Sequence, residues 1–200
     1  MTRRLVLATH NAHKLEELAA ILGPALAGFE LVPTDGPDPI EDGMTFAENA
    51  LIKARAAVAH TGLPALADDS GIAVDALGGA PGIHSKRYAG TGADQDNIDL
   101  LLRELEGATD RTARFVCAAA FVDPDGTEIV EVAEFPGEVL RAPVGDGGFG
   151  YDPVFRPEGS ERSLAEFSEE EKNAVSHRSL AFRALMPAVE AWSSGSAGTS

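Results

Sequence analysis

The chain has 200 residues and a formal net charge of −16, which is enough length for one domain, with or without a sub-lobe, and a substantial core. The acidic excess argues against DNA or another long polyanion as a partner, because repulsion opposes approach, but this does not apply to a nucleotide that carries its own metal. The single cysteine, Cys117, excludes an internal disulfide and a cysteine-cluster zinc site, and the sequence has no evident secretory or membrane-spanning run, so we expect a cytoplasmic protein.

Apolar runs alternate with helical patterns in the first half of the chain. Short runs without polar alternation predict buried strands, and apolar residues at helical spacing predict helices. Strands are expected at residues 4–9, at 29–33 and from 65 onward, helices at 10–22 and 45–60, and a loop at 34–43. The third strand is expected to end at two adjacent carboxylates, Asp68 and Asp69.

The second half of the chain begins with a helix and then changes to a hairpin pattern. A helix is expected at residues 93–105 with Asp94 as its N-cap, followed by long strands at 113–122 and 127–140 joined by a DPDG turn. A short strand at 152–156, a helix that begins with the capping box of Ser168 and Glu171, and a last helix at 176–192 complete the pattern. We predict an α/β fold: a mixed twisted sheet with flanking helices, in two lobes around a central cleft. Residues 1–192 form this single domain, and 193–200 form a disordered tail.

The stretch ALADDSGIAVDALGGAPGIHSKRYAG, residues 65–90, combines acidic, glycine-rich and basic segments. Successive side chains of a strand point to opposite faces, so only one of Asp68 and Asp69 can face a given cleft. Carboxylates over an α/β sheet can hold a divalent metal, and a loop of small residues can approach a ligand closely. The alternative is a strand that ends in a solvated turn and an ordinary loop.

Two lysines of the first half are candidate phosphate ligands. The segment THNAHK, residues 9–14, joins a strand to a helix N-terminus, where free N–H groups and the helix dipole favour phosphate, and Lys14 lies in the first turn. An ordinary helix start with a surface lysine is the alternative. Lys53 shares a helix face with Asn49, and it either extends to solvent, which this helix alone favours, or points into a cleft.

Two segments of the second half are candidate binding elements. In GGFGYDP, residues 147–153, Phe149 or Tyr151 could stack on a purine and Asp152 could accept from its N–H edge, or both aromatic residues could belong to the core. Near a helix junction, Arg178 could grip a phosphate or a carbonyl, with Lys172 and His177 beside it. The alternative is that Ser176 caps the last helix and that His177 and Arg178 lie in its solvated first turn.

Taken together, five segments resemble the inosine/xanthosine triphosphate pyrophosphatase family, whose members hydrolyse non-standard purine nucleoside triphosphates. They are LATHNAHKLEEL, TFAENALIKA, ADDSGIAVDALGGAPGIHSKRYAG, GGFGYDP and EEKNAVSHRSLA, in the order that the family has. The resemblance covers nearly the whole chain. It implies a two-lobed α/β fold, a homodimer, dependence on Mg²⁺, and hydrolysis of ITP, dITP and XTP to the monophosphate and pyrophosphate.

The resemblance also assigns roles to residues of this sequence. Asp69 is the catalytic proton acceptor and a metal ligand, and Glu41 is the expected second metal ligand, although relatives often carry a further acid where this chain has Ile40. The substrate-binding residues that it implies are Thr9, His10, Asn11, Ala12, His13, Lys14, Lys53, Ser70, Phe149, Gly150, Tyr151, Asp152, Lys172, His177 and Arg178.

These residues suggest a mechanism and leave two other classes of function to test. An activated water attacks the α-phosphorus in line, pyrophosphate leaves, Asp69 accepts the proton, and Asp68 adjusts the pKa of Asp69 through its like charge. One alternative is a nucleotide-binding regulatory module without turnover. The other is a phosphatase with a covalent aspartate, which needs a lysine and a second acid in its own motif order.

Overall fold

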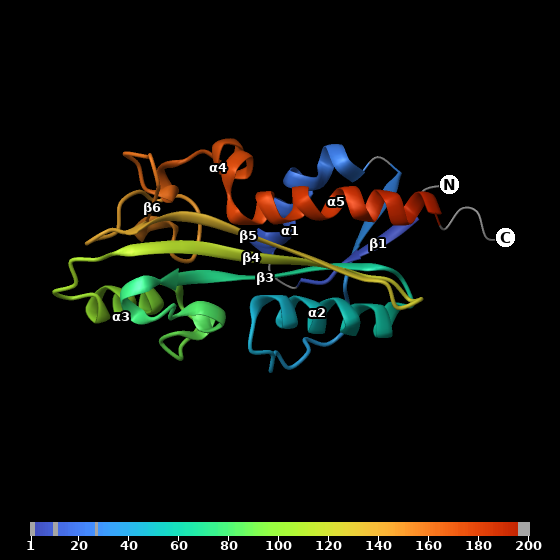
Figure 1. The fold of residues 1–200 in the computed structure, drawn as a ribbon, viewed down its shortest axis with the longest axis horizontal. Coiled ribbons are helices and arrows are strands. Elements are labelled where there is room, and N and C mark those ends of the chain that lie inside the picture. Colours follow the sequence, from blue (N-terminus) through green and yellow to red (C-terminus); the bar gives the residue numbers. More distant parts are fainter. Residues whose placement is uncertain (1–2, 10–11, 27, 196–200) are drawn as a thin grey trace. The chain divides into compact units, whose positions relative to one another are not determined.

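The computed structural model of the chain describes residues 3–9, 12–26 and 28–195. Within these residues, six strands form one sheet in the order β2-β1-β3-β4-β5-β6 (Figure 1). β1 is parallel to β2 and to β3, whereas β6 is antiparallel to β5. The strands are β1 (Arg3–Leu7), β2 (Phe29–Pro33), β3 (Ala65–Val74), β4 (Thr112–Val122), β5 (Glu128–Val139) and β6 (Phe155–Pro157). The predicted α/β class with a mixed sheet and flanking helices is confirmed.

The helices follow the predicted succession. They are α1 (Ala12–Leu22), α2 (Phe46–Thr61), α3 (Asp94–Glu104), α4 (Glu169–Val175) and α5 (His177–Gly195). α4 begins with the predicted capping box, in which Ser168 accepts from the backbone N–H of Glu171. α5 continues to Gly195, three residues into the segment that was expected to be disordered, and residues 196–200 lie outside those described.

The chain divides into two compact units. The first comprises Met1–Asp69, Cys117–Ala133 and Arg178–Ser200, and the second comprises Ser70–Val116 and Glu134–His177. The boundary falls inside β3, β4 and β5, so each of these long strands contributes residues to both units. The cleft expected between two lobes stays a prediction, as does the single-domain assignment.

The first unit has three layers because its strands are apolar on both faces. Alternate residues of β1 point to opposite sides, with Leu5 and Leu7 in one core cluster and Val6 and Ala8 in the other. α1 and α5 cover the first face, and α2 covers the second (Figure 1). The buried hydrophobic residues of α2 in this cluster are Ala50, Ala54 and Ala57, and Phe46, Leu51 and Val58 pack against it in part.

α2 has explicit signals at both ends. Thr45 is the N-cap and forms a capping box with Glu48, whose carboxylate accepts from the backbone of Thr45. The helix ends at Gly62 in the left-handed conformation, with φ of 65°. These caps fix the register of the helix, and therefore the places of Asn49 and Lys53 on it.

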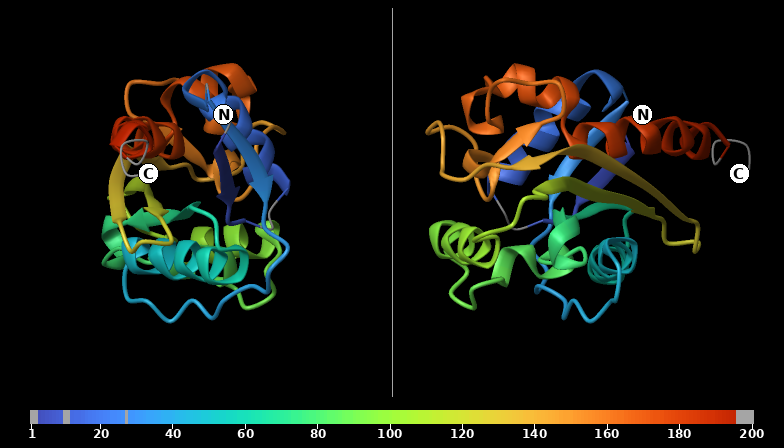
Figure 2. Two further views of the ribbon diagram at one scale, coloured as in Figure 1. Left: turned by 90° about the vertical axis from the view of Figure 1, so that its right-hand side faces the viewer. Right: turned by 60° about the vertical axis from the view of Figure 1, so that its left-hand side comes forward.

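β4 and β5 form the predicted hairpin, whose two strands run to a common turn in the right view of Figure 2. The Asp123 carboxylate accepts from the backbone N–H groups of Asp125 and Thr127, at 2.8 and 3.0 Å, and Gly126 donates to the carbonyl of Asp123. The aspartate side chain therefore organises the turn, as the DPDG sequence predicts.

The second unit has its own core. α3 contributes Ile98 and Leu101, and Leu105 follows as its C-cap; all three cluster with the end of β3 and with aromatic residues that include Phe115 and Phe155. Arg111 donates to the carbonyl of Leu105, which the end of α3 leaves open, and to the carbonyls of Val139 and Leu140 at the end of β5.

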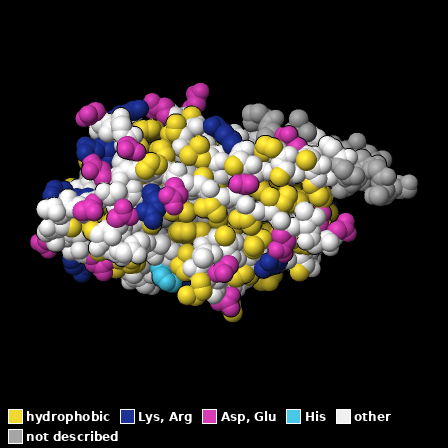
Figure 3. Space-filling view, in the orientation of Figure 1, with side chains coloured by type: hydrophobic (Ala, Val, Ile, Leu, Met, Phe, Trp, Pro, Cys, Tyr) yellow, Lys and Arg dark blue, Asp and Glu magenta, His cyan; other side chains and the backbone are white. Residues whose placement is uncertain are grey.

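Acidic side chains are spread over the face shown in Figure 3, interspersed with lysine and arginine rather than gathered in one patch. Among the described residues, no helix is long and apolar enough to cross a membrane.

Candidate active site

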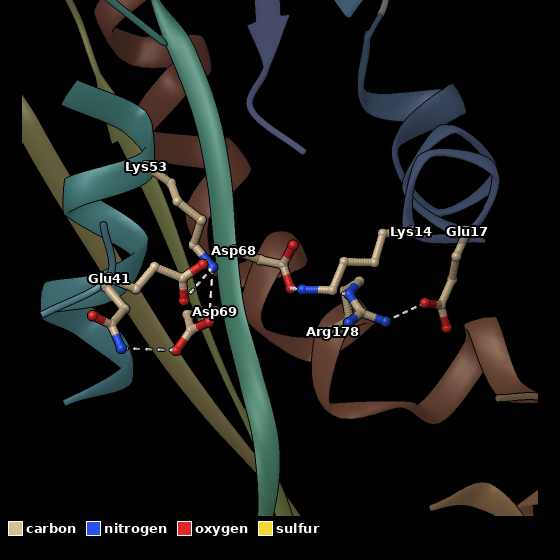
Figure 4. Close-up of polar contacts among 8 residues, drawn as sticks. Lys14, Glu17, Glu41, Lys53, Asp68, Asp69 and Arg178 are labelled. Carbon is tan, nitrogen blue, oxygen red and sulfur yellow. Dashed lines mark hydrogen bonds and ion pairs between the residues drawn. The ribbon is translucent and has the colours of Figure 1, made fainter. Parts of the chain in front are cut away.

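Asp68 and Asp69 lie in the middle of β3, and the prediction that the strand ends at them is wrong. The strand continues through Gly71 to Val74, and Ile72 and Val74 are fully buried. A carboxylate can occupy a buried strand only where a cation offsets its desolvation. Each of the two aspartates has such a cation, on its own side of the strand (Figure 4).

Asp68 belongs to a buried network of four charged residues in the first unit. Its Oδ2 lies 2.8 Å from Lys14 Nζ and 3.2 Å from Arg178 Nε, and Arg178 also forms an ion pair with Glu17. The Asp68 side chain is 0% exposed and that of Arg178 is 2% exposed. Among the described residues, this network contains two cations, Lys14 and Arg178, and two anions, Asp68 and Glu17.

The pKa of Asp68 reflects these contacts. Burial alone would raise it, but the positive charges of Lys14, Arg178 and Lys53 hold the pKa of this carboxyl far below its usual range. Burial would likewise lower the pKa of Arg178, and the carboxylates of Asp68 and Glu17 raise it instead. Asp68 therefore stays ionised, and its role is to balance buried cations.

Asp69 faces the other side of β3 and has a different environment. Lys53 Nζ lies 2.7 Å from Asp69 Oδ1 and 3.6 Å from Glu41 Oε2, so one ammonium group serves both carboxylates. Asn49 Nδ2 adds a long contact of 3.5 Å to Asp69 Oδ2. Figure 4 shows Lys53, Glu41 and Asp69 grouped beside α2, away from the Asp68 network.

Sharing a single cation leaves the Asp69 carboxylate less stabilised than that of Asp68. Burial raises the pKa of Asp69, the negative charge of Glu41 adds to this rise, and Lys53 and Lys14 offset it only in part. The like charge of Glu41 raises the pKa of Asp69, and the effect expected from Asp68 stays a prediction. Burial lowers the pKa of Lys53, but the neighbouring carboxylates outweigh this effect and raise it. A carboxylate with a raised pKa is suited to accept a proton.

The pair of Asp69 and Glu41 also fits a hard divalent cation. Both carboxylates approach one positive group, the Lys53 ammonium, so their oxygens already converge on a cation. No group of three histidine, cysteine, aspartate or glutamate side chains suited to a metal occurs in the described part of the chain. Two carboxylates are nevertheless the usual protein contribution to a Mg²⁺ that also binds substrate phosphates and water.

Lys14 and Lys53 both form ion pairs with aspartates of β3, whereas the pattern of each helix alone favoured an exposed lysine. Lys14 pairs with Asp68, 54 residues away, and Lys53 pairs with Asp69 instead of extending to solvent. Thr9 lies between β1 and α1 and is half-buried. His10 and Asn11 lie outside the described residues, as do the side chains of Ala12 and His13, so the phosphate-binding role of this loop stays a prediction.

In the second unit, Asp152 organises the segment around Phe149. Its Oδ2 accepts from the backbone N–H of Phe149 at 2.9 Å and from Lys172 Nζ at 2.7 Å. Lys172 Nζ also lies 4.3 Å from the centre of the Phe149 ring, in cation–π geometry. A side chain at Gly148 would overlap the Asp152 carboxylate, which explains the glycine there.

The short strand expected from Asp152 begins instead with a 3₁₀ turn, Asp152–Val154, and β6 follows it. Asp94 does not cap α3; it is the first residue of that helix, and its Oδ2 accepts from the backbone N–H of Gly150 at 2.8 Å. The prediction of an Asp94 N-cap is wrong because this carboxylate instead holds the glycine loop.

Two of the predicted binding residues are packed inside the second unit. Tyr151 is buried and its hydroxyl donates to the carbonyl of Ser85 at 2.8 Å; burial raises the pKa of this phenol. The His177 ring stacks on Phe115, with ring centres 4.7 Å apart. Phe149 is only half-buried, so it is better placed than Tyr151 to offer a ring face to a base. Ser70, next to Asp69 in β3, is also half-buried.

Glu17 and Asn49 take part in these contacts but were not predicted as site residues. Glu17 lies three residues after Lys14 on α1, and Asn49 lies four residues before Lys53 on α2. These spacings place each residue on the same helix face as a candidate lysine, which was a signal available in the sequence.

Comparison with known proteins identifies the family of the chain. The Ham1 family matches residues 5–188. A protein of Streptomyces coelicolor named dITP/XTP pyrophosphatase is 55% identical, over 93% of this chain and 96% of its own, and one of Corynebacterium efficiens with the same name is 51% identical, over 93% and 97%.

Solved structures agree with this comparison. The HAM1 protein from Coxiella burnetii is 41% identical with a TM-score of 0.87, covering 94% of this chain and 99% of its own. A dITP/XTP pyrophosphatase from Mycobacterium abscessus is 45% identical with a TM-score of 0.76, covering 93% and 99%. The five motifs, the arrangement around Asp69 and these similarities agree, and the chain belongs to the Ham1 family.

Proposed function

We propose that this protein hydrolyses dITP, XTP and ITP to the nucleoside monophosphate and pyrophosphate, and so removes non-standard purines from the nucleotide pool. The observation that carries the proposal is the group of Asp69, Lys53 and Glu41, in a chain 55% identical to a dITP/XTP pyrophosphatase. The relatives are named for turnover, which favours an enzyme over a regulatory module that only binds nucleotide.

Asp69 is the proton acceptor in this proposal. A water oxygen bonds to the α-phosphorus, the bond from this phosphorus to the bridging oxygen of the β-phosphate breaks, and pyrophosphate leaves. The water proton goes to Asp69, whose pKa is raised by burial and by Glu41, which brings it closer to neutral pH. Asp68, paired with Lys14 and Arg178, keeps its charge throughout.

Asp69 and Glu41 are the residues that would hold Mg²⁺. Such an ion neutralises phosphate charge and lowers the pKa of water bound to it. Lys53 lies beside both carboxylates, and its ammonium group stabilises negative charge that develops on the substrate.

The substrate contacts follow the motifs. Lys14 and the loop at residues 9–14 bind phosphates, together with Lys172 and Arg178, although Arg178 acts from a buried position beside Asp68. Phe149 stacks on the base, and the glycine segment beside it is held in place by Asp152 and Asp94, which accept from the backbone N–H groups of Phe149 and Gly150. Ser70, His177 and Tyr151 complete the nucleotide site.

The proposal includes a homodimer in the cytoplasm. The resemblance to the family supports the dimer, and the buried, unbridged Cys117 is compatible with a reducing compartment. Light scattering coupled to size-exclusion chromatography measures the mass directly, and a value near one chain, 20.9 kDa, would contradict the dimer.

The test of the proposed function is product analysis. The protein is incubated with XTP or dITP and Mg²⁺, and the products are separated by ion-exchange chromatography, with EDTA in a parallel sample. We expect the monophosphate and pyrophosphate in equal amounts, and neither with EDTA. Release of orthophosphate with the diphosphate as the other product would contradict the assigned bond cleavage, and binding without products would support the regulatory module.

A further inference from the structure

Lys53 occupies the position in which a cation would satisfy both Asp69 and Glu41. Its Nζ lies 2.7 Å from one carboxylate and 3.6 Å from the other. The Lys53 side chain is 14% exposed and that of Asp69 is 10% exposed, so bulk water only weakly screens the contact between them. The two carboxylates are thus already neutralised in part by a group of the chain itself.

The carboxylates are held together by more than Lys53. Asn49, one turn before Lys53 on α2, is buried and accepts from the backbone N–H of Gly43 at 2.9 Å. This bond ties the loop that carries Glu41 to the helix, and the other end of the same amide lies 3.5 Å from Asp69. A side chain at position 43 would collide with the Asn49 amide, so the loop can lie this close to α2 only with glycine at that position.

We propose that Lys53 is an internal competitor of the divalent cation: in the nucleotide-free protein its ammonium group holds the carboxylates that the cation needs. A cation that approaches Asp69 and Glu41 must displace this group and also meets its repulsion. The inference rests on the assignment of Asp69 and Glu41 as metal ligands in the proposed function.

The nucleotide changes this competition. Its phosphates provide an alternative anion for Lys53, so the lysine can leave the carboxylates without losing a countercharge. Cation and nucleotide then favour each other's binding: the nucleotide draws Lys53 away from the carboxylates that the cation needs, and the cation frees Lys53 to bind the phosphates. The chain would bind free cation weakly and the nucleotide–cation pair well.

The test is calorimetric titration of the nucleotide-free protein with Mn²⁺, which needs no turnover. Lys53→Gln removes the competing charge, and we expect it to bind Mn²⁺ at least about tenfold more tightly than the wild type, which corresponds to about 1.4 kcal/mol. Lys53→Met is a second variant without the charge and should behave alike. Lys53→Arg keeps a cation and should stay near the wild type.

Arg55→Gln is the matched control. It lies on the same helix and changes the net charge by the same amount, but Arg55 pairs with Glu128 on the surface. We expect its Mn²⁺ affinity to equal that of the wild type, so that a general electrostatic effect is separated from the local one.

Two negative outcomes are distinguishable. If Glu41→Gln abolishes Mn²⁺ binding but neither Lys53→Gln nor Lys53→Met strengthens it, the competition is wrong while the metal assignment stands. If Glu41→Gln leaves binding as in the wild type, or if no variant binds Mn²⁺, the metal assignment in the proposed function fails, and the inference fails with it.

Discussion

Asp68 and Asp69 are neighbours in β3, yet each carboxylate has its own lysine on its own face of the strand: Lys14 at 2.8 Å from Asp68 and Lys53 at 2.7 Å from Asp69. Asp68 has Arg178 as a second cation, whereas Asp69 shares its single lysine with Glu41. The pKa values of these two neighbouring carboxyl groups are therefore shifted in opposite directions. One is held in the charged form, and the other has its pKa raised.

Asp69→Asn should abolish most of the turnover and leave the protein folded. The amide has nearly the same size, so packing is kept, while the proton acceptor is lost; general-base removal costs roughly 10²–10⁴-fold in rate. Because the pKa of Asp69 is raised in the folded state, the stability it contributes is present below the unfolded pKa and is lost as pH rises through the folded value. At pH 7 the amide avoids the burial of a charged carboxylate but also removes one partner of Lys53, which keeps Glu41, so the urea transition of the variant should stay close to that of the wild type. Near wild-type kcat with Mg²⁺ would show that Asp69 is not the acceptor.

Asp68→Asn should show the opposite pattern. It removes a fully buried countercharge from Arg178 and Lys14, and breaking a buried ion pair costs about 3–5 kcal/mol. The pKa of Asp68 is lowered by folding, so its contribution to stability is present above the unfolded pKa of about 4 and is lost as pH falls. Urea unfolding at several pH values should show a gap between wild type and variant that narrows below about pH 4. A gap that does not change with pH would contradict an ionised Asp68.

Glu17 and Arg178 should be coupled in a double-mutant cycle. Glu17→Gln and Arg178→Met each leave a buried charge without its partner, and the double variant removes both, so the loss should be less than additive by about 1–3 kcal/mol. The control is Glu16→Gln, an exposed neighbour on α1, for which we expect a change within about 0.5 kcal/mol. Additive losses measured by urea unfolding would mean that the two residues do not stabilise each other.

Lys14→Ala should weaken binding of the triphosphate and barely change affinity for the bare nucleoside. A hydrogen bond to a charged group contributes about 1.5–3 kcal/mol, so KM for XTP should rise roughly tenfold or more. Lys172→Ala should behave alike, since its motif is also matched to phosphate binding. Lys86→Ala, at a lysine whose side chain is 69% exposed, is the control and should leave KM unchanged. Equal losses for nucleoside and triphosphate would remove both lysines from the phosphate site.

The succession of elements could be predicted because it depends on local pattern. β2 occupies Phe29–Pro33 as expected from a short apolar run, and the Asp123 turn forms because its side chain bonds to its own backbone neighbours. The end of β3 was placed too early because two carboxylates resemble a solvated turn. Their burial depends on cations that arrive from other elements, and periodicity carries no information about those.

In the site, too, the residues could be predicted from local motifs, but the contacts between distant residues could not. Asp69, Glu41 and Lys53 were named from motifs, but the pairing of Lys53 with both carboxylates is a property of the folded chain. Arg178 reaches Asp68 across 110 residues of sequence, and no local pattern indicates that contact. Asp94 looked like a helix cap because capping propensity is local, whereas its actual partner, Gly150, lies 56 residues away.

The selection of the base tests the central proposal most directly. Hypoxanthine and xanthine present a carbonyl at position 6 and an N–H at position 1, where adenine has an amino group and a bare nitrogen. A pocket with a donor for the carbonyl, from His177 or from a backbone N–H of the glycine segment that bonds to no carboxylate, leaves that donor facing another donor in ATP. Each buried unpaired polar group costs about 1–3 kcal/mol, so two mismatches give roughly several hundred-fold discrimination or more.

Guanine shares the 6-keto edge, so its rejection must rest on its 2-amino group, and GTP should be rejected less cleanly than ATP. The measurement is kcat/KM for ITP, XTP, GTP and ATP at one Mg²⁺ concentration. We expect ITP and XTP to be the best substrates, GTP to be weaker, and ATP to be the poorest by several hundred-fold. Turnover of ATP comparable to that of ITP would contradict the recognition of the 6-keto edge, and with it the proposed function.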